Sequence, residues 1–356
     1  MPTAQVNGNG AEIFYEDSGA PPGSTDYATI VIVHGLVFHS GTFKRTLPFA
    51  APNNLRIVAI NQRDYPGSTL YTASELDRIT SSNVEDLELA LQAQGQEFAT
   101  FLVHLINAGG VLPVQEKDGK KSGGLAVLGW SLGNLVPLCM FGNAKHIEEE
   151  TKSLLNEYLR TLVIFDSPPF PIGEPIPKEF SFPLWDSTIA PEDRGPCFAI
   201  WVGTYFSPAV PDLSSMDIQA LESRTNISQT SEPDNMAPTT SRMSVEELQS
   251  MTHPEVLERS GGPLMELEPA VYWRVTERAL FETDGVFASV DAVAIWCNMS
   301  VAPCVWAARR IAERAEAAKT EGKRGRKVDT VKIDGANHFP HWDEPERLVR
   351  LLADSI

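Results

Sequence analysis

Short runs of apolar residues, many of them β-branched, recur along the chain and alternate with longer stretches of helical periodicity. The runs are too apolar for strands that expose one face to water, which is typical of strands buried on both faces of a parallel sheet. They lie at 29–33, 55–60, 125–128, 161–165 and 301–307, and a last, more polar strand is expected at 328–333. Helical patterns occupy 84–108, 151–160, 309–320 and 345–356. This alternation predicts an α/β fold with a mostly parallel sheet, built from right-handed crossovers and flanked by helices.

The strand pattern disappears in the second half of the chain. From residue 168 to about 290, aromatic residues are scattered among prolines, and 223–244 is a polar stretch that predicts a loop. Helical patterns return at 245–259 and 268–281. We therefore expect 168–290 to form an inserted, mainly helical lid over an α/β core made of 1–167 and 291–356.

The sequence Gly-Trp-Ser-Leu-Gly at 129–133 stands where the apolar run at 125–128 gives way to an apolar helical segment. That context is typical of a nucleophile elbow, a sharp strand-to-helix turn that lifts a serine hydroxyl clear of the sheet. A side chain at either glycine would crowd such a turn, and the serine has to adopt a strained backbone. Ser131 is therefore the candidate nucleophile, and the N–H of Leu132 at the helix start is a candidate oxyanion donor.

A serine hydroxyl is a poor nucleophile at neutral pH and needs a base within hydrogen-bond reach. His338 follows the last predicted strand. Because reactive residues gather beyond the carboxyl ends of parallel strands, we expect it near Ser131. His341 is the reserve, and its other interpretation is a lid-facing residue or one at a helix start. The base in turn needs a carboxylate that fixes its tautomer.

These features together resemble the α/β-hydrolase fold family. The resemblance rests, in matching order and spacing, on His-Gly at 34–35, Arg-Asp-Tyr-Pro-Gly-Ser at 63–68, the motif at 129–133 and Asp-Gly-Ala-Asn-His at 334–338. It implies that the residue after the His-Gly pair, Leu36, supplies the second oxyanion N–H, with Val37 in reserve. It also implies that 63–68 shapes the loop behind the site.

The acid departs from the family's commonest pattern. Many members carry it in a turn after the strand that follows the lid, but the predicted strand at 301–307 is followed by no carboxylate until Glu313. A smaller set of relatives, including haloalkane dehalogenases and a fungal lactone hydrolase that opens zearalenone, carries it one strand after the elbow. Asp166 holds that position here, and pairing with His338 would offset the cost of burying it. Its other interpretation is a capping or turn residue. Weaker candidates for the acid are Asp334 and Asp284.

The resemblance and the candidate residues predict a serine hydrolase that cleaves a carboxylic ester or lactone through an acyl-enzyme. Haloalkane dehalogenation does not fit, because that chemistry uses an aspartate where Ser131 stands. Aromatic residues of the insertion favour a fairly apolar substrate. Candidate substrate contacts are Val37, Trp130, Trp185 and Phe339. Two alternatives stay open: the same triad used for carbon–carbon hydrolysis, perhydrolysis or acyl transfer, and a member of the fold that binds a ligand without catalysis.

The expected chemistry implies a small-molecule substrate as the partner, and the oligomeric state stays open. The net charge of −18 disfavours nucleic acid and anionic membrane surfaces. The four cysteines show no metal-binding spacing and are interpreted as buried free thiols, and no dinucleotide-binding glycine pattern occurs. We therefore expect neither metal nor cofactor. Residues 1–10 do not resemble a secretory signal, and no apolar run approaches the about 18 residues of a membrane span, so we expect a cytoplasmic protein.

Overall fold

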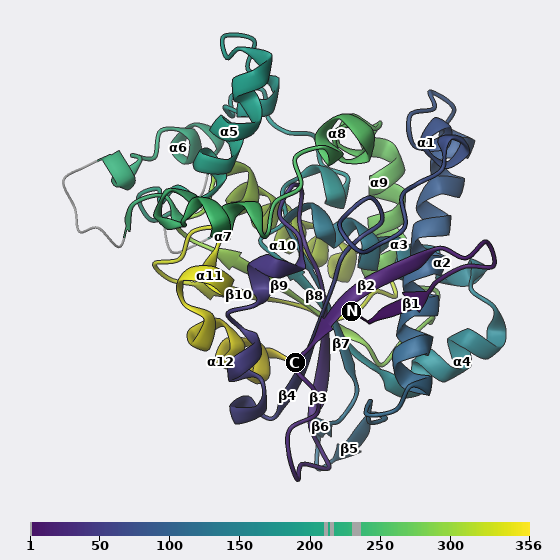
Figure 1. Cartoon of the computed structure of the whole chain (residues 1–356). Coiled ribbons are helices and arrows are strands. Elements are labelled where there is room, and N and C mark those ends of the chain that lie inside the picture. Colours follow the sequence, from purple (N-terminus) through teal and green to yellow (C-terminus); the bar gives the residue numbers. More distant parts are fainter. Residues whose placement is uncertain (1, 210–212, 214–216, 230–235) are drawn as a thin grey trace.

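The computed structural model describes all residues except 1, 210–212, 214–216 and 230–235. Its centre is an eight-stranded sheet with the strand order β1-β2-β4-β3-β7-β8-β9-β10 (Figure 1). The strands are β1 (Thr3–Gln5), β2 (Glu12–Asp17), β3 (Ala28–Val33), β4 (Leu55–Ile60), β7 (Leu125–Trp130), β8 (Leu159–Phe165), β9 (Asp291–Cys297) and β10 (Val328–Ile333). Pairing is parallel from β4 to β10 and antiparallel where β1 and β2 join. The predicted mostly parallel α/β sheet is confirmed.

Helices flank the sheet on both faces. The α-helices are α1 (Ala73–Ile79), α2 (Val84–Asn107), α3 (Leu135–Gly142), α4 (Glu149–Tyr158), α5 (Pro191–Val202), α6 (Ile218–Glu222), α7 (Val245–Gln249), α8 (Gly262–Met265), α9 (Pro269–Thr276), α10 (Ala302–Thr320), α11 (Pro340–Asp343) and α12 (Pro345–Ser355). A 3-10 helix, η4 (Ser131–Asn134), precedes α3, and a π-helix, η13 (Glu277–Phe281), follows α9. Between α2 and β7 the chain forms a short antiparallel hairpin, β5 (Gln115–Lys117) and β6 (Lys120–Ser122). In the part of the chain that the structure describes, no helix has the length and apolar character to cross a membrane.

Successive residues of the parallel strands alternate between two apolar cores, one on each face of the sheet. On β3, Val31 and Val33 enter the first core, while Ile30 and Ile32 enter the second. Side chains of α2, α3, α9 and α10 complete the first core, and side chains of α11 and α12 complete the second. Burial on both faces explains why these strands are continuous apolar runs.

One predicted strand is wrong. Val301 is the N-cap of α10, residues 302–307 form the first turns of this helix, and the strand before it is β9. The run is apolar because the start of α10 is buried, and a short apolar run has no period that separates a buried strand from a buried helix. Pro303 fits the helix, because proline is tolerated in the first turn. The strand that follows the insertion is therefore β9, and the turn after it is the segment 298–300.

The stretch at 168–290 divides into two parts with different packing. Helices α5 and α6 stand at the end of the molecule opposite the β5–β6 hairpin (Figure 1). Since that hairpin precedes β7, they lie toward the carboxyl ends of the parallel strands. By contrast, Val271, Val275 and Leu280 of α9 and η13 join the first core beside α2 and α3. The lid role and the boundaries at 168 and 290 remain predictions.

Candidate active site

The turn after β7 places Ser131 at a strained position. Its φ is +55°, in the left-handed region that residues other than glycine seldom adopt. A Cβ on Gly129 would lie 2.3 Å from Asn134 Cα, and one on Gly133 would lie 2.1 Å from the carbonyl oxygen of His34. Only glycine fits at both positions, and η4 follows at once. The geometry is that of a nucleophile elbow.

Asp166 lies buried at the carboxyl end of β8. Its Oδ1 accepts a hydrogen bond from the Cys297 N–H at 3.0 Å, and its Oδ2 accepts one from the Ser300 hydroxyl at 2.6 Å. Oδ2 also lies 2.6 Å from Nδ1 of His338. A buried carboxylate is costly unless it is hydrogen bonded, and these three donors satisfy it. The expected pairing of Asp166 with His338 is present.

His338 is buried in the loop after β10, between Asp166 and the ring of Trp130. The indole Nε1 of Trp130 donates to the His338 carbonyl at 3.0 Å, and the two rings lie 4.9 Å apart. With Nδ1 facing Asp166, Nε2 is the nitrogen left for Ser131. No hydrogen bond joins Ser131 to His338, both of which the structure describes. Such bonds often tighten only in the complex with substrate.

Ser131 and His338 line one cavity at the carboxyl edge of the sheet. Its other lining residues are Leu36, Leu132, Pro168, Phe170, Phe182, Phe198, Trp201, Val202, Met265, Val301, Pro303 and Cys304. The polar side chains among them are the hydroxyl of Ser131, the imidazole of His338 and the thiol of Cys304. Three aromatic rings from around α5 contact one another in the wall, those of Phe182, Phe198 and Trp201.

The two candidate oxyanion donors, Leu36 and Leu132, both line this cavity. The N–H of Leu132 lies in the first turn of η4, where backbone N–H groups have no partner within the helix. The reserve candidate, Val37, already donates its N–H to the hydroxyl of Tyr65 at 3.0 Å. Leu36 is therefore the better placed of the two neighbours.

None of the four predicted substrate contacts lines the cavity. Trp130 and Phe339 are buried and pack edge to face at 5.2 Å. Val37 belongs to the second apolar core. Trp185 is 44% exposed, and its ring lies tilted against that of Phe182 with centroids 4.6 Å apart. Sequence reasoning missed the aromatic lining residues Phe170, Phe182, Phe198 and Trp201 because the stretch 168–202 shows no clear strand or helix periodicity. The concentration of aromatic residues there was the one available signal.

The weaker candidates for acid and base lie elsewhere. Asp334 accepts from the side chain of Asn298 at 3.0 Å, and Asp284 is exposed in a turn. The ring of His341 is buried and stacks on Phe43 with centroids 4.3 Å apart. Burial holds the pKa of His341 well below its usual range, so this ring is neutral and supports the packing behind the site.

Cys304 lies beside Asp166 and His338, here called the acid–base pair. Sequence reasoning did not single out this cysteine. Its Sγ lies 3.8 Å from Nδ1 of His338, and the ligand-type atoms of Asp166, Cys304 and His338 lie within 4.8 Å of one another. Burial raises the pKa of the Cys304 thiol, so the sulfur is a neutral thiol rather than a thiolate. Oδ2 of Asp166 and Nδ1 of His338 are within hydrogen-bond distance of each other. That hydrogen bond explains why these side chains lie so close together.

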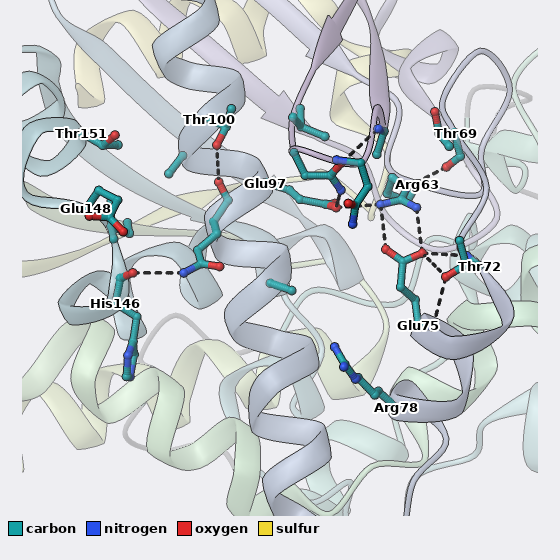
Figure 2. A pocket seen from close by; sticks show the side chains of 18 of the residues that line it. Arg63, Thr69, Thr72, Glu75, Arg78, Glu97, Thr100, His146, Glu148 and Thr151 are labelled. Carbon is teal, nitrogen blue, oxygen red and sulfur yellow. Dashed lines mark hydrogen bonds and ion pairs between the residues drawn. The ribbon is translucent and has the colours of Figure 1, made fainter.

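A polar groove elsewhere on the surface shares no lining residue with this cavity. Figure 2 shows side chains that line the groove. The groove is bordered by α1, α2 and the start of α4. Arg63 forms ion pairs there with Glu75 at 3.1 Å and with Glu97 at 2.7 Å. Asn7 also donates to Glu97 at 2.6 Å. These contacts tie α1 and α2 to the loop after β4, which agrees with a structural role for 63–68.

Comparisons with known proteins place the chain in a family. A model described as the alpha/beta hydrolase family matches residues 30–351. Solved structures with the same fold include Cfl2 from Burkholderia cenocepacia, with 13% identity, coverage of 99% of this chain and 94% of that one, and a TM-score of 0.54. A laboratory-evolved variant of a potato epoxide hydrolase has 14% identity, coverage of 99% and 98%, and a TM-score of 0.54. A bromoperoxidase from Bacillus anthracis has 10% identity, coverage of 100% and 99%, and a TM-score of 0.50. Comparison with curated proteins finds no match.

Proposed function

Because the chain belongs to the alpha/beta hydrolase family, we propose that it is a serine hydrolase in which Ser131 attacks the carbonyl carbon of a carboxylic ester or lactone. The observation that carries the proposal is a shared cavity. Ser131, on its strained turn, lines the same apolar cavity as His338, whose Nδ1 lies 2.6 Å from Asp166 Oδ2. This is the set of groups that acyl transfer to a serine requires.

The mechanism begins with proton transfer from Ser131 to Nε2 of His338 as the hydroxyl oxygen bonds to the carbonyl carbon. Asp166 holds the imidazole in the tautomer that leaves Nε2 free, and it stabilises the imidazolium that forms. The carbonyl oxygen becomes an oxyanion, which the N–H groups of Leu132 and Leu36 bind. His338 then returns the proton to the leaving alcohol.

The second half of the reaction uses the same groups in reverse. Water gives a proton to His338 and attacks the acyl carbon, and the oxyanion forms again between the same N–H groups. Its collapse breaks the bond to Ser131, which recovers its proton from His338, and the free acid leaves. An apolar cavity wall excludes bulk water and strengthens each of these charge interactions.

The cavity supports an apolar substrate. Apart from Ser131, His338 and Cys304, its lining side chains are apolar, so a charged or strongly polar acyl group would lose its hydration without a partner. The ring of Trp201 lies 5.3 Å from that of Phe182 and forms part of the aromatic wall. We therefore propose that the acyl or alcohol part seated there is aliphatic or aromatic.

Hydrolysis of a series of aryl esters with acyl chains of increasing length, together with matched lactones, tests this proposal. We expect release of the free acid and alcohol, with kcat/KM rising for apolar acyl groups. Trp201→Ala should lower kcat/KM for the preferred ester by about tenfold, the effect of losing a few apolar contacts. Trp185→Ala is the matched control, because that ring lies outside the cavity.

Two results would count against the proposal. Equal turnover of charged and apolar acyl groups would remove the argument for an apolar substrate. A product in which the acyl group passes to another acceptor in water, with no free acid, would replace hydrolysis by acyl transfer.

A further inference from the structure

Arg224 is a half-buried cation that reaches from the segment after α6 to the loop after β9. Its Nη1 donates to the carbonyl of Asn298 at 3.1 Å, and its Nη2 donates to the carbonyl of Ser300 at 2.6 Å. Its Nε donates to the carbonyl of Leu221 at 3.1 Å. All these partners are neutral, and among the described residues no carboxylate forms a salt bridge with this guanidinium.

The loop that Arg224 holds is the one that presents donors to Asp166. The N–H of Cys297 and the hydroxyl of Ser300 bind the two carboxylate oxygens. Ser300 donates to Oδ2, the same oxygen that faces Nδ1 of His338. A shift of the Ser300 backbone would therefore move the hydroxyl that orients Asp166. The guanidinium fixes that backbone through two carbonyls with a rigid, forked geometry.

The same loop also touches the segment that carries His338. The side-chain oxygen of Asn298 accepts from the Gly335 N–H at 2.8 Å, and the N–H of Met299 donates to the Ala336 carbonyl at 2.9 Å. Segment 298–300 thus contacts the loop that carries His338 on one side and Arg224 of the inserted stretch on the other. Displacing it would disturb the acid and the base together.

Charge gives Arg224 a second connection to the pair. Burial lowers the pKa of Arg224 to about 10, an effect that the nearby Asp166 carboxylate partly offsets. The side chain is therefore still a cation at neutral pH. The Arg224 guanidinium forms no salt bridge, and the buried Asp166 carboxylate accepts hydrogen bonds from the neutral groups of Cys297 and Ser300. The opposite charges of Arg224 and Asp166 therefore stabilise each other.

We propose that Arg224 is a positioning residue for the acid–base pair: it fixes the 298–300 loop so that Ser300 orients Asp166, and its charge stabilises the Asp166 carboxylate. The inference rests on the proposed function, because it assigns work to Asp166 and His338. It also gives the inserted stretch a role beyond the cavity wall, since the pair is fully oriented only when this stretch is seated.

Other titratable groups around the pair do not duplicate this charge. They are Cys297, Cys304, His341, Glu222, Glu344 and Arg347. Burial raises the pKa of both thiols and lowers that of His341, so these three are neutral. Arg347 and Glu344 pair with each other at 2.8 Å, and the side chain of Glu222 accepts from the hydroxyl of Ser181.

The test compares Arg224→Gln with Arg224→Lys in the full chain, using the rate at which a fluorophosphonate probe labels Ser131 between pH 5 and 9. Arg224→Gln should slow labelling by on the order of 10- to 100-fold, the cost of a small misplacement of reacting groups. Loss of the cation favours the imidazolium form of His338, so the acid limb of the profile should move to higher pH. Arg224→Lys keeps the charge and should keep the limb at the wild-type pH. For an aryl ester, kcat should fall more than KM changes.

Arg242→Gln is the matched control, because Arg242 also ties the inserted stretch to the core, through Asp343 at 2.7 Å, without touching the 298–300 loop. Its acid limb should stay at the wild-type pH. A wild-type rate and limb in Arg224→Gln, or the same shift in Arg242→Gln, would overturn the positioning role while leaving the proposed function intact. Failure of the wild-type protein to be labelled at Ser131 would instead overturn the proposed function and the inference with it.

Discussion

Replacing Ser131 with alanine is expected to lower kcat for the preferred ester by about a million-fold, the loss typical of removing the nucleophile of a serine hydrolase. The hydroxyl oxygen forms the covalent bond in the proposed mechanism, and no neighbouring group in the cavity replaces it. The thiol of Cys304 lines the same cavity, but burial raises its pKa, so it is a weak nucleophile. The measurement is steady-state turnover of an aryl ester by the two purified proteins.

The control for this substitution is Ser74→Ala, which removes an exposed hydroxyl on α1. Its turnover should equal that of the wild-type protein, and thermal unfolding should show that Ser131→Ala is folded. Full turnover by folded Ser131→Ala would remove Ser131 from the mechanism.

Replacing Asp166 with asparagine is expected to lower kcat by about 10,000-fold, because an amide no longer holds the histidine in the tautomer that accepts the serine proton. The carboxylate accepts from Cys297, Ser300 and His338. An amide in its place keeps the size of the side chain but turns one acceptor into a donor, which conflicts with at least one of these partners. The measurement is kcat for the same ester, alongside a circular dichroism spectrum that reports folding.

Asp334→Asn is the matched control for the acid. Asp334 lies in the loop before His338 and binds Lys332 and Asn298 on the surface. We expect it to retain turnover within a few-fold of wild type, as do most substitutions away from special sites. The opposite ranking, with Asp334→Asn inactive and Asp166→Asn active, would move the acid to the loop after β10.

Much of the site could be predicted because parallel strands fix where their following residues go. Ser131 follows β7, Asp166 follows β8 and His338 follows β10. The strands expected at 125–128, 161–165 and 328–333 agree with β7, β8 and β10. Strand ends of a parallel sheet meet at one edge, so residues that follow the three strands were expected to lie near one another. The choice of Asp166 among the candidate acids came from the resemblance to relatives that carry the acid one strand after the elbow.

The rest depended on contacts that local patterns do not encode. The strand predicted at 301–307 is the buried start of α10, whose residues are apolar for the reason that strand residues are. The strand after the insertion is β9, and the turn that follows it, 298–300, contains no carboxylate. This turn instead supplies Ser300, whose hydroxyl donates to Asp166. Arg224 lies far from Asp166 along the chain, in a segment read as a polar loop.

The most direct test of the account is to treat the protein with a fluorophosphonate probe and to map the modified residue by mass spectrometry. The account predicts a single covalent label on Ser131, with labelling slowed strongly in Asp166→Asn and His338→Ala. A label on another residue, or no label on the folded protein under conditions that modify other serine hydrolases, would contradict it.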